Sequence, residues 1–107
     1  MDKERARSLK PIMGFVEKLK KAYAPSLILM FGSRARGDEL RGSDYDIMVV
    51  SSAFEGKGWI RRHEEAYAYW DNELDLLCYS PEEFRVKRGQ IGIVSKALKE
   101  GTVIYQN

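Results

Sequence analysis

The chain has 107 residues, enough for one domain with a hydrophobic core, so we expect a single domain over residues 1–107. Its 44% hydrophobic and 32% charged content is typical of a soluble globular protein, and a net charge of +2 is too small to indicate a nucleic-acid partner by itself. One cysteine excludes an intrachain disulfide, and the sequence has neither a secretory signal nor a run of ~20 apolar residues, so we expect a cytoplasmic protein without a membrane segment.

Residues 9–23 carry apolar side chains at helical spacing, with lysines and Glu17 on the other side. The apolar positions are Leu9, Ile12, Met13, Val16, Leu19 and Tyr23. Pro11 is compatible with the first turn of such a helix if Ser8 caps it. We expect a helix that covers one face of a sheet.

Two short apolar runs follow, residues 27–31 and 47–50, and turn residues separate them, which predicts two strands. Gly32 directly after the first run allows a close approach of the backbone to a ligand. Ser33 supplies a hydroxyl and begins a basic helical turn with Arg34 and Arg36, whose free backbone amides suit a phosphate group.

Asp44 and Asp46 open the second strand and, because side chains alternate along a strand, they point to the same face. Two carboxylates that close repel each other unless a proton or a cation lies between them. A hard cation such as Mg²⁺, which takes one or two protein carboxylates and leaves other positions to phosphates, fits this pair. The alternative is a solvated ion-pair network on a sheet edge, formed by Arg34, Arg36, Asp38, Asp44 and Asp46.

The segment Ser51–Gly58 is expected to be a loop, and a helix is expected from about Trp59 to Asp71. This helix presents apolar and aromatic side chains on one stripe, formed by Ile60, His63, Tyr67 and Trp70. We interpret the aromatic residues, Trp59 included, as core residues rather than as a stacking site for a base, and His63, the only histidine, as structural rather than catalytic.

The third strand, Glu73–Tyr79, contains one acidic residue inside an apolar alternation, Asp75. Leu77 and Tyr79 share its face, and the other face carries Leu74, Leu76 and Cys78. We expect Asp75 to point inward, where an unpaired carboxylate is costly, and a shared metal ion would account for it. The alternative is a salt bridge between an edge strand and one of the arginines.

Ser80, Pro81 and Glu83 match a capping box with proline at the first helical position, which predicts a helix to about Lys87. Further helical spacing follows at Ile91, Val94 and Leu98, then Gly101 and a last short strand, residues 102–105. Alternating strands and helices predict an α/β (α+β) fold, a small mixed sheet flanked by helices.

Gly32-Ser33, ten further residues and Asp44-x-Asp46 resemble the nucleotidyltransferase signature of the DNA polymerase beta superfamily. The segment FGSRARG, residues 31–37, is similar to the corresponding segment of its small stand-alone branch, the minimal nucleotidyltransferases. The resemblance covers roughly residues 27–84 and departs from the family at Tyr45, where the residue between the two aspartates is usually aliphatic. It implies a polymerase beta palm-like fold.

The resemblance also implies the chemistry, in which a nucleoside monophosphate moves from a nucleoside triphosphate, ATP in our reading, to an acceptor hydroxyl. Asp44, Asp46 and Asp75 would act as catalytic carboxylates that hold two Mg²⁺ ions. Gly32, Ser33, Arg34 and Arg36 would bind the phosphates, with either arginine neutralising the leaving pyrophosphate.

The acceptor is expected to come from a partner, either a homodimer mate or a small helical HEPN-type protein that is modified on a tyrosine in a toxin–antitoxin system. A nucleic-acid acceptor is also compatible with the sequence. The alternative from a different functional class is a non-catalytic binding module that neutralises its partner by contact, but such a module has no need of three acidic residues.

Overall fold

The computed structural model describes residues 10–32, 45–69 and 74–107. In these residues four strands form one mixed sheet in the order β3-β2-β1-β4. The strands are β1 (Leu27–Phe31), β2 (Tyr45–Val50), β3 (Leu74–Tyr79) and β4 (Thr102–Gln106). β1 pairs antiparallel with both β2 and β4, and β2 pairs parallel with β3. The predicted mixed sheet is confirmed.

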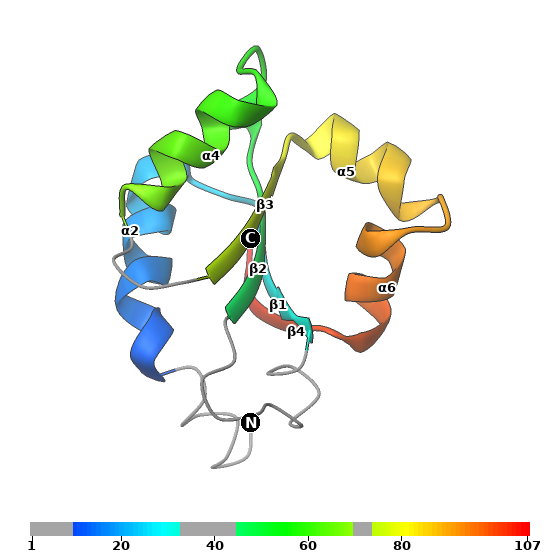
Figure 1. Cartoon of the computed structure of the whole chain (residues 1–107), viewed down its shortest axis with the longest axis horizontal. Helices are drawn as coiled ribbons and strands as arrows, with labels where there is room; N and C mark the ends of the chain where they lie inside the picture. The colour runs from blue at the N-terminus through cyan, green and yellow to red at the C-terminus, as the bar shows by residue number, and fades with distance from the viewer. Residues whose placement is uncertain (1–9, 33–44, 70–73) are drawn as a thin grey trace.

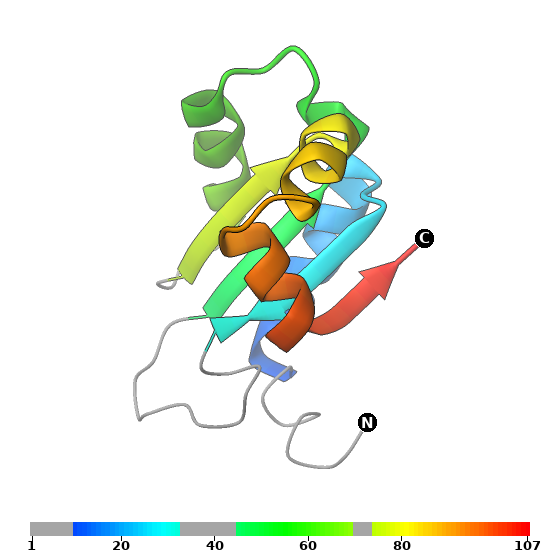
Figure 2. The same ribbon diagram turned by 90° about the vertical axis from the view of Figure 1, so that its right-hand side faces the viewer.

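Helices cover both faces of the sheet (Figure 1). They are α2 (Met13–Tyr23), α4 (Trp59–Tyr67), α5 (Pro81–Arg88) and α6 (Ile93–Glu100), with two 3-10 turns, η1 (Lys10–Ile12) and η2 (Ser52–Phe54). Helices α2 and α4 lie on one side, and α5 and α6 on the other, in front of the strands in Figure 2. The sheet is therefore the middle of three layers.

Two buried clusters hold the layers together, one on each face of the sheet. On the α2 side, Phe15, Val16 and Leu19 pack against alternate strand residues such as Ile28 and Ile47. On the α6 side, Val94 and Ala97 pack against the others, including Leu29, Met48 and Val50. All five residues of β1 are buried, because this strand has a neighbour on each edge and helices on each face.

The first helix forms as the sequence predicts, but its start differs. The 3-10 turn at Pro11 precedes α2, which begins at Met13, and the predicted cap Ser8 lies outside the described residues. Met13 is partly exposed, whereas Phe15 is buried, so the buried stripe is rotated from the predicted one. Ala24 ends the helix in the left-handed conformation (φ 43°), with its N–H bonded to the carbonyl of Lys20.

A helix begins at Trp59 as predicted, but the interpretation of its aromatic stripe as core residues is wrong. Ile60 is 73% exposed and Trp59 46% exposed, while the buried residues are Arg62 and Ala66. The helix also ends at Tyr67 rather than near Asp71, and Trp70 lies outside the described residues. The helix runs along the edge of the sheet, so polar side chains as well as apolar ones face the protein.

These polar side chains bind the outer edge of β3. The Tyr67 hydroxyl accepts from the N–H of Leu76 (3.0 Å) and donates to the carbonyl of Leu74 (3.2 Å). His63 Nε2 accepts from the N–H of Cys78 (3.2 Å), while its Nδ1 lies 2.7 Å from the Trp59 carbonyl. Side chains of α4 thus take the place of a further strand, and the structural reading of His63 accounts for both ring nitrogens.

Arg62 connects four segments from its buried position. Its Nη1 donates to the Cys78 carbonyl (3.2 Å) and to Glu83 Oε1 (2.6 Å), and its Nη2 to the carbonyls of Phe54 (3.0 Å) and Lys57 (2.6 Å). Its Nε has no hydrogen-bond partner in the described part of the chain. Glu83 also completes the predicted capping box of α5, so one carboxylate starts a helix and pairs with the buried arginine.

Candidate functional site

The sheet brings Asp46 and Asp75 together. Asp46 is the second residue of β2 and Asp75 the second residue of β3, and they are direct partners in the parallel register of these strands. Neighbouring strands lie about 4.8 Å apart, and paired residues of parallel strands point to the same face. Both carboxylates therefore share the α5 and α6 face, near the end of the sheet where β2 and β3 begin.

Asp75 shares its face with Leu77 and Tyr79, as predicted. Its side chain is exposed, however, so the expectation of an inward-pointing, buried carboxylate is wrong. The helices α5 and α6 cover Tyr79 and only partly Leu77, and they leave the beginning of β3 open. In the part of the chain that the structure describes, Asp75 forms no ion pair.

Gly32 lies beside Asp46 at the end of β1, because Phe31 is the register partner of Asp46. Its φ of +75° is a conformation that side chains rarely adopt. A Cβ at this position would overlap Oδ2 of Asp46 and lie 2.9 Å from Cγ. Glycine is therefore favoured both by the backbone conformation and by the close approach of the carboxylate.

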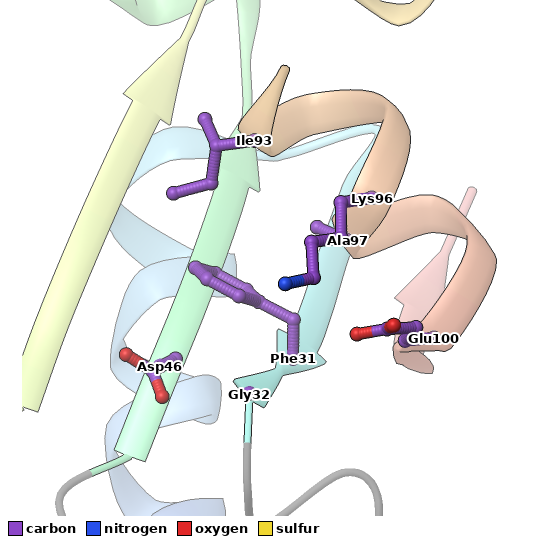
Figure 3. Close-up of a pocket in the computed structure, with 7 residues that line it drawn as sticks. All are labelled: Phe31, Gly32, Asp46, Ile93, Lys96, Ala97 and Glu100. Carbon is purple, nitrogen blue, oxygen red and sulfur yellow. The ribbon is translucent and has the colours of Figure 1, made fainter. Parts of the chain in front are cut away.

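A pocket of about 210 Å³ opens at this point (Figure 3). Its walls come from the end of β1, from β2 and from α6, and they are formed by Phe31, Gly32, Asp46, Ile93, Lys96, Ala97 and Glu100. The α6 residues were not recognised as site residues from the sequence. The only signal was their helical spacing of three and four, which equally fits an ordinary surface helix.

The other predicted site residues, Ser33, Arg34, Arg36 and Asp44, lie outside the described residues. Asp44 is the immediate neighbour of Tyr45, the first residue of β2. Among the residues that the structure describes, no group of three histidine, cysteine or acidic side chains is arranged to hold a metal ion.

A comparison with protein-family models identifies the family of this chain. The model described as "Nucleotidyltransferase domain" matches residues 12–105, nearly the whole chain. The chain belongs to the nucleotidyltransferase domain family. The match includes Gly32, Asp46 and Asp75, and it confirms the resemblance seen in the sequence. The protein is thus a nucleotidyltransferase, and nucleotidyltransferase domains typically use a divalent metal ion.

Solved structures support the nucleotidyltransferase fold. A protein from Sulfolobus solfataricus described as a nucleotidyltransferase is 23% identical with a TM-score of 0.72, covering 97% of this chain and 85% of its own. A toxin–antitoxin structure with AMP-PNP is 21% identical with a TM-score of 0.54, covering 87% and 72%. BolA1 from Arabidopsis thaliana is 20% identical with a TM-score of 0.52, covering 78% and 98%.

At these identities the three structures show the fold alone, and BolA1 illustrates that the fold extends beyond proteins named as nucleotidyltransferases. A search of curated protein sequences finds no significant match. No helix in the described residues is both long and apolar enough to cross a membrane.

Proposed function

We propose that this nucleotidyltransferase transfers AMP from Mg²⁺-bound ATP to a tyrosine hydroxyl of a small helical HEPN-type partner protein. The observation that carries the proposal is the in-register pairing of Asp46 and Asp75 on one face of the sheet, beside Gly32. Two neighbouring carboxylates suit a metal ion, and the backbone at Gly32, which has no side chain, allows a phosphate group to come close to that ion.

The residues fit a divalent cation. Aspartate oxygens are the ligands that Mg²⁺ prefers, and the exposed side chain of Asp75 leaves room for a metal-bound substrate. We propose that Asp44, Asp46 and Asp75 hold the metal, with two ions in the complete site. When bound, Mg²⁺ would neutralise charge on the triphosphate and orient it for attack.

The chain would act mainly by positioning and charge. The acceptor oxygen attacks the α-phosphorus, a new O–P bond forms, and the bond from the α-phosphorus to the bridging oxygen breaks. The electron pair stays on the leaving pyrophosphate, and the hydroxyl proton passes to Asp75. We propose that Gly32 and Ser33 hold the β- and γ-phosphates and that Arg34 or Arg36 neutralises the pyrophosphate.

The toxin–antitoxin structure supports ATP as the nucleotide and a protein as the partner. That structure contains AMP-PNP, an ATP analogue, and its fold is similar to this one over 87% of the present chain. The family match alone is equally compatible with other nucleotides and other acceptors. ATP and a protein partner are therefore the most specific reading that the comparisons favour.

An exposed apolar surface beside the pocket suits such a partner. It consists of Ile91 and Ile93 at the α5–α6 connection, which line one hollow, with Ile91 fully exposed. Ile93 also lines the pocket that contains Asp46, so a protein seated here would lie next to the site. Lys87 lines one hollow with Ile91 and Ile93, and Arg88 lines a neighbouring hollow with Ile91, so we propose that the partner contributes an apolar face with acidic groups around it.

The direct test is incubation of the protein with α-³²P-labelled ATP, Mg²⁺ and the product of the adjacent gene. We expect label on a tyrosine of the partner, no label with the metal chelated, and a loss of at least ~100-fold in the Asp75→Asn variant, since removal of a metal-binding carboxylate removes transition-state stabilisation. The variant should keep its melting temperature because Asp75 is exposed.

Two results would contradict the proposal in different ways. A stable complex with the partner but no label with any of the four nucleotides would favour the binding-only module. Undiminished transfer by Asp75→Asn would show that Asp75 is not one of the catalytic carboxylates.

The partner surface has its own test. Ile91→Glu should abolish transfer to the partner while leaving ATP binding unchanged, because it places a charge on the apolar surface. Ile60→Glu is the matched control, since Ile60 is also exposed but lies on α4, across the sheet. Equal transfer by both variants would show that the partner binds elsewhere.

A further inference from the structure

Among the residues that the structure describes, Lys96 is the one basic residue on the wall of the pocket that contains Asp46. Figure 3 shows its side chain extending from α6 into the pocket, over Phe31. Asp46 and Gly32 form the opposite side of the same small space. A single bound group in this pocket therefore meets both the Lys96 ammonium and the carboxylate that we assign to the metal.

The packing of α6 determines where Lys96 lies. Val94 and Ala97 are each 2% exposed and pack against the sheet, so the helix cannot rotate freely. At the end of the helix a Cβ on Gly101 would come within 2.8 Å of the Met30 carbonyl, so glycine allows α6 and β1 to approach closely. Lys96 precedes the buried Ala97 and is held over the pocket although its own side chain is exposed.

The Lys96 ammonium forms no ion pair with any residue in the described ranges. Other lysines are paired, for example Lys57 with Glu65 at 2.7 Å and Lys20 with Glu17 at 3.3 Å. Lys96 therefore needs no rearrangement of an existing salt bridge before it binds an anion.

We propose that Lys96 binds the phosphate tail of the nucleoside triphosphate and stabilises the charge of the leaving pyrophosphate. When the bond to the α-phosphorus breaks, negative charge increases on the bridging oxygen, and the ammonium donates hydrogen bonds to it without losing its proton. This inference rests on the proposed function and adds to it a cation from the last helix of the chain, far in sequence from the Gly-Ser turn.

The pocket also has apolar walls, formed by Phe31, Ile93 and Ala97, and such walls could bind a nucleoside instead of the phosphates. Two observations favour the phosphates. The pocket includes Gly32, the first residue of the predicted phosphate-binding turn, and it includes Asp46, whose metal would bind phosphate oxygens. A neutral nucleoside has no group that requires the ammonium.

The test uses inorganic tripolyphosphate with Mg²⁺ as the probe, measured by titration calorimetry. We expect Lys96→Met to weaken its binding by roughly 10- to 100-fold, the effect of losing a hydrogen bond between charged groups. Lys96→Arg should retain most of the affinity because the charge remains. Lys99→Met is the matched control, one residue from the end of the same helix and absent from this pocket. It should bind as the wild type does.

Three outcomes would overturn the inference, and they separate it from the proposed function. If Lys96→Met binds tripolyphosphate as tightly as the wild type and still needs Mg²⁺, Lys96 does not bind the phosphates, while the proposed function stands. Loss of affinity for adenosine but not for tripolyphosphate would make the pocket a nucleoside site. No binding of tripolyphosphate or ATP by the wild-type protein would contradict the proposed function itself, and this inference with it.

Discussion

Gly32 illustrates how a single residue serves the backbone and the site at once. Its positive φ could in principle be adopted by another residue with some strain, but the neighbouring Asp46 carboxylate leaves no room for a Cβ. The glycine of the Gly-Ser pair is therefore explained by the carboxylate as well as by the turn. The contact between Gly32 and Asp46 joins the Gly-Ser pair to the Asp-x-Asp pair, and the sequence alone did not predict this contact.

We expect Gly32→Ala to lower the free energy of unfolding by about 2 kcal/mol and to reduce nucleotide transfer strongly, because the methyl group displaces Asp46. Gly56→Ala is the control, since Gly56 has a similar φ of +78° but no atom within 4 Å of the added Cβ. It should cost only the backbone strain, about 1 kcal/mol, and leave transfer unchanged. Equal effects in chemical denaturation and transfer assays would contradict the role of the contact.

Glu83 should make stability depend on pH in the acidic range. Burial alone would raise the pKa of its carboxyl, but hydrogen bonds from Ser80 and Arg62 outweigh burial and lower the pKa below its ordinary 4.5. The stabilisation is therefore fully present above pH 4.5 and is lost as the pH falls through the lower folded-state pKa.

Melting temperatures measured between pH 6 and pH 3 test this expectation. The wild-type protein should lose stability on acidification more steeply than Glu83→Gln, which lacks the titrating group. Glu82→Gln is the control, because the Glu82 carboxyl is exposed and pairs with Arg85 on the surface. The dependence of its melting temperature on pH should stay closer to that of the wild type. Parallel curves for the wild type and Glu83→Gln would contradict the prediction.

At the scale of elements, α4 protects one of the two edges of the sheet, the one formed by β3. In the described residues, β3 has a strand on one side only, and its backbone groups on the other side bond to side chains of Tyr67, His63 and Arg62. An open strand edge pairs readily with other chains, so this arrangement also limits aggregation. These three side chains of α4 are thus structural.

Arg62→Met should destabilise the protein by about 3 kcal/mol, because it leaves a carboxylate and several backbone carbonyls without their donor. The matched control is the adjacent Arg61→Met. Arg61 is 69% exposed and pairs with Glu65 on the surface, so its loss should cost about 0.5 kcal/mol or less. Similar losses for both variants in urea denaturation would show that the buried arginine contributes little.

At the scale of the whole molecule, the parallel pairing of β2 and β3 creates the site. The chain passes through η2 and α4 between these strands, so residues 29 positions apart become direct neighbours, Asp46 beside Asp75. On the opposite face the same strands carry one of the two buried clusters, which includes Cys78 at 0% exposure. Opening of the core and loss of the site should therefore be coupled.

The thiol of Cys78 provides a probe of that coupling. Burial raises its pKa from 9.0 to about 12, although the nearby Arg62 partly opposes this, so the folded protein should react very slowly with Ellman's reagent at pH 8. We expect labelling in urea to be on the order of 100-fold faster or more, because it requires opening of the core. A native rate close to the denatured one would contradict the burial of Cys78.

The sequence by itself determined the succession of elements, because apolar periodicity and capping residues are local. The strand Leu27–Phe31 and the capping box at Ser80 appear in the structure as predicted, and the family follows from the Gly-Ser and Asp-x-Asp motif, which the family model confirms. The helix limits were less accurate, as at Met13 and Tyr67, because helix ends depend on packing as well as on propensity.

Only the tertiary structure decided which side chains meet. Arg62 and Glu83 pair across 21 residues, and Lys96 reaches the pocket of Asp46 from the last helix. Helix packing also decided that Asp75 is exposed, since α5 follows the far end of β3 and α6 lies against β1 (Figure 1). Such contacts join residues distant in sequence, and their positions depend on how whole helices pack on the sheet, so no local pattern records them.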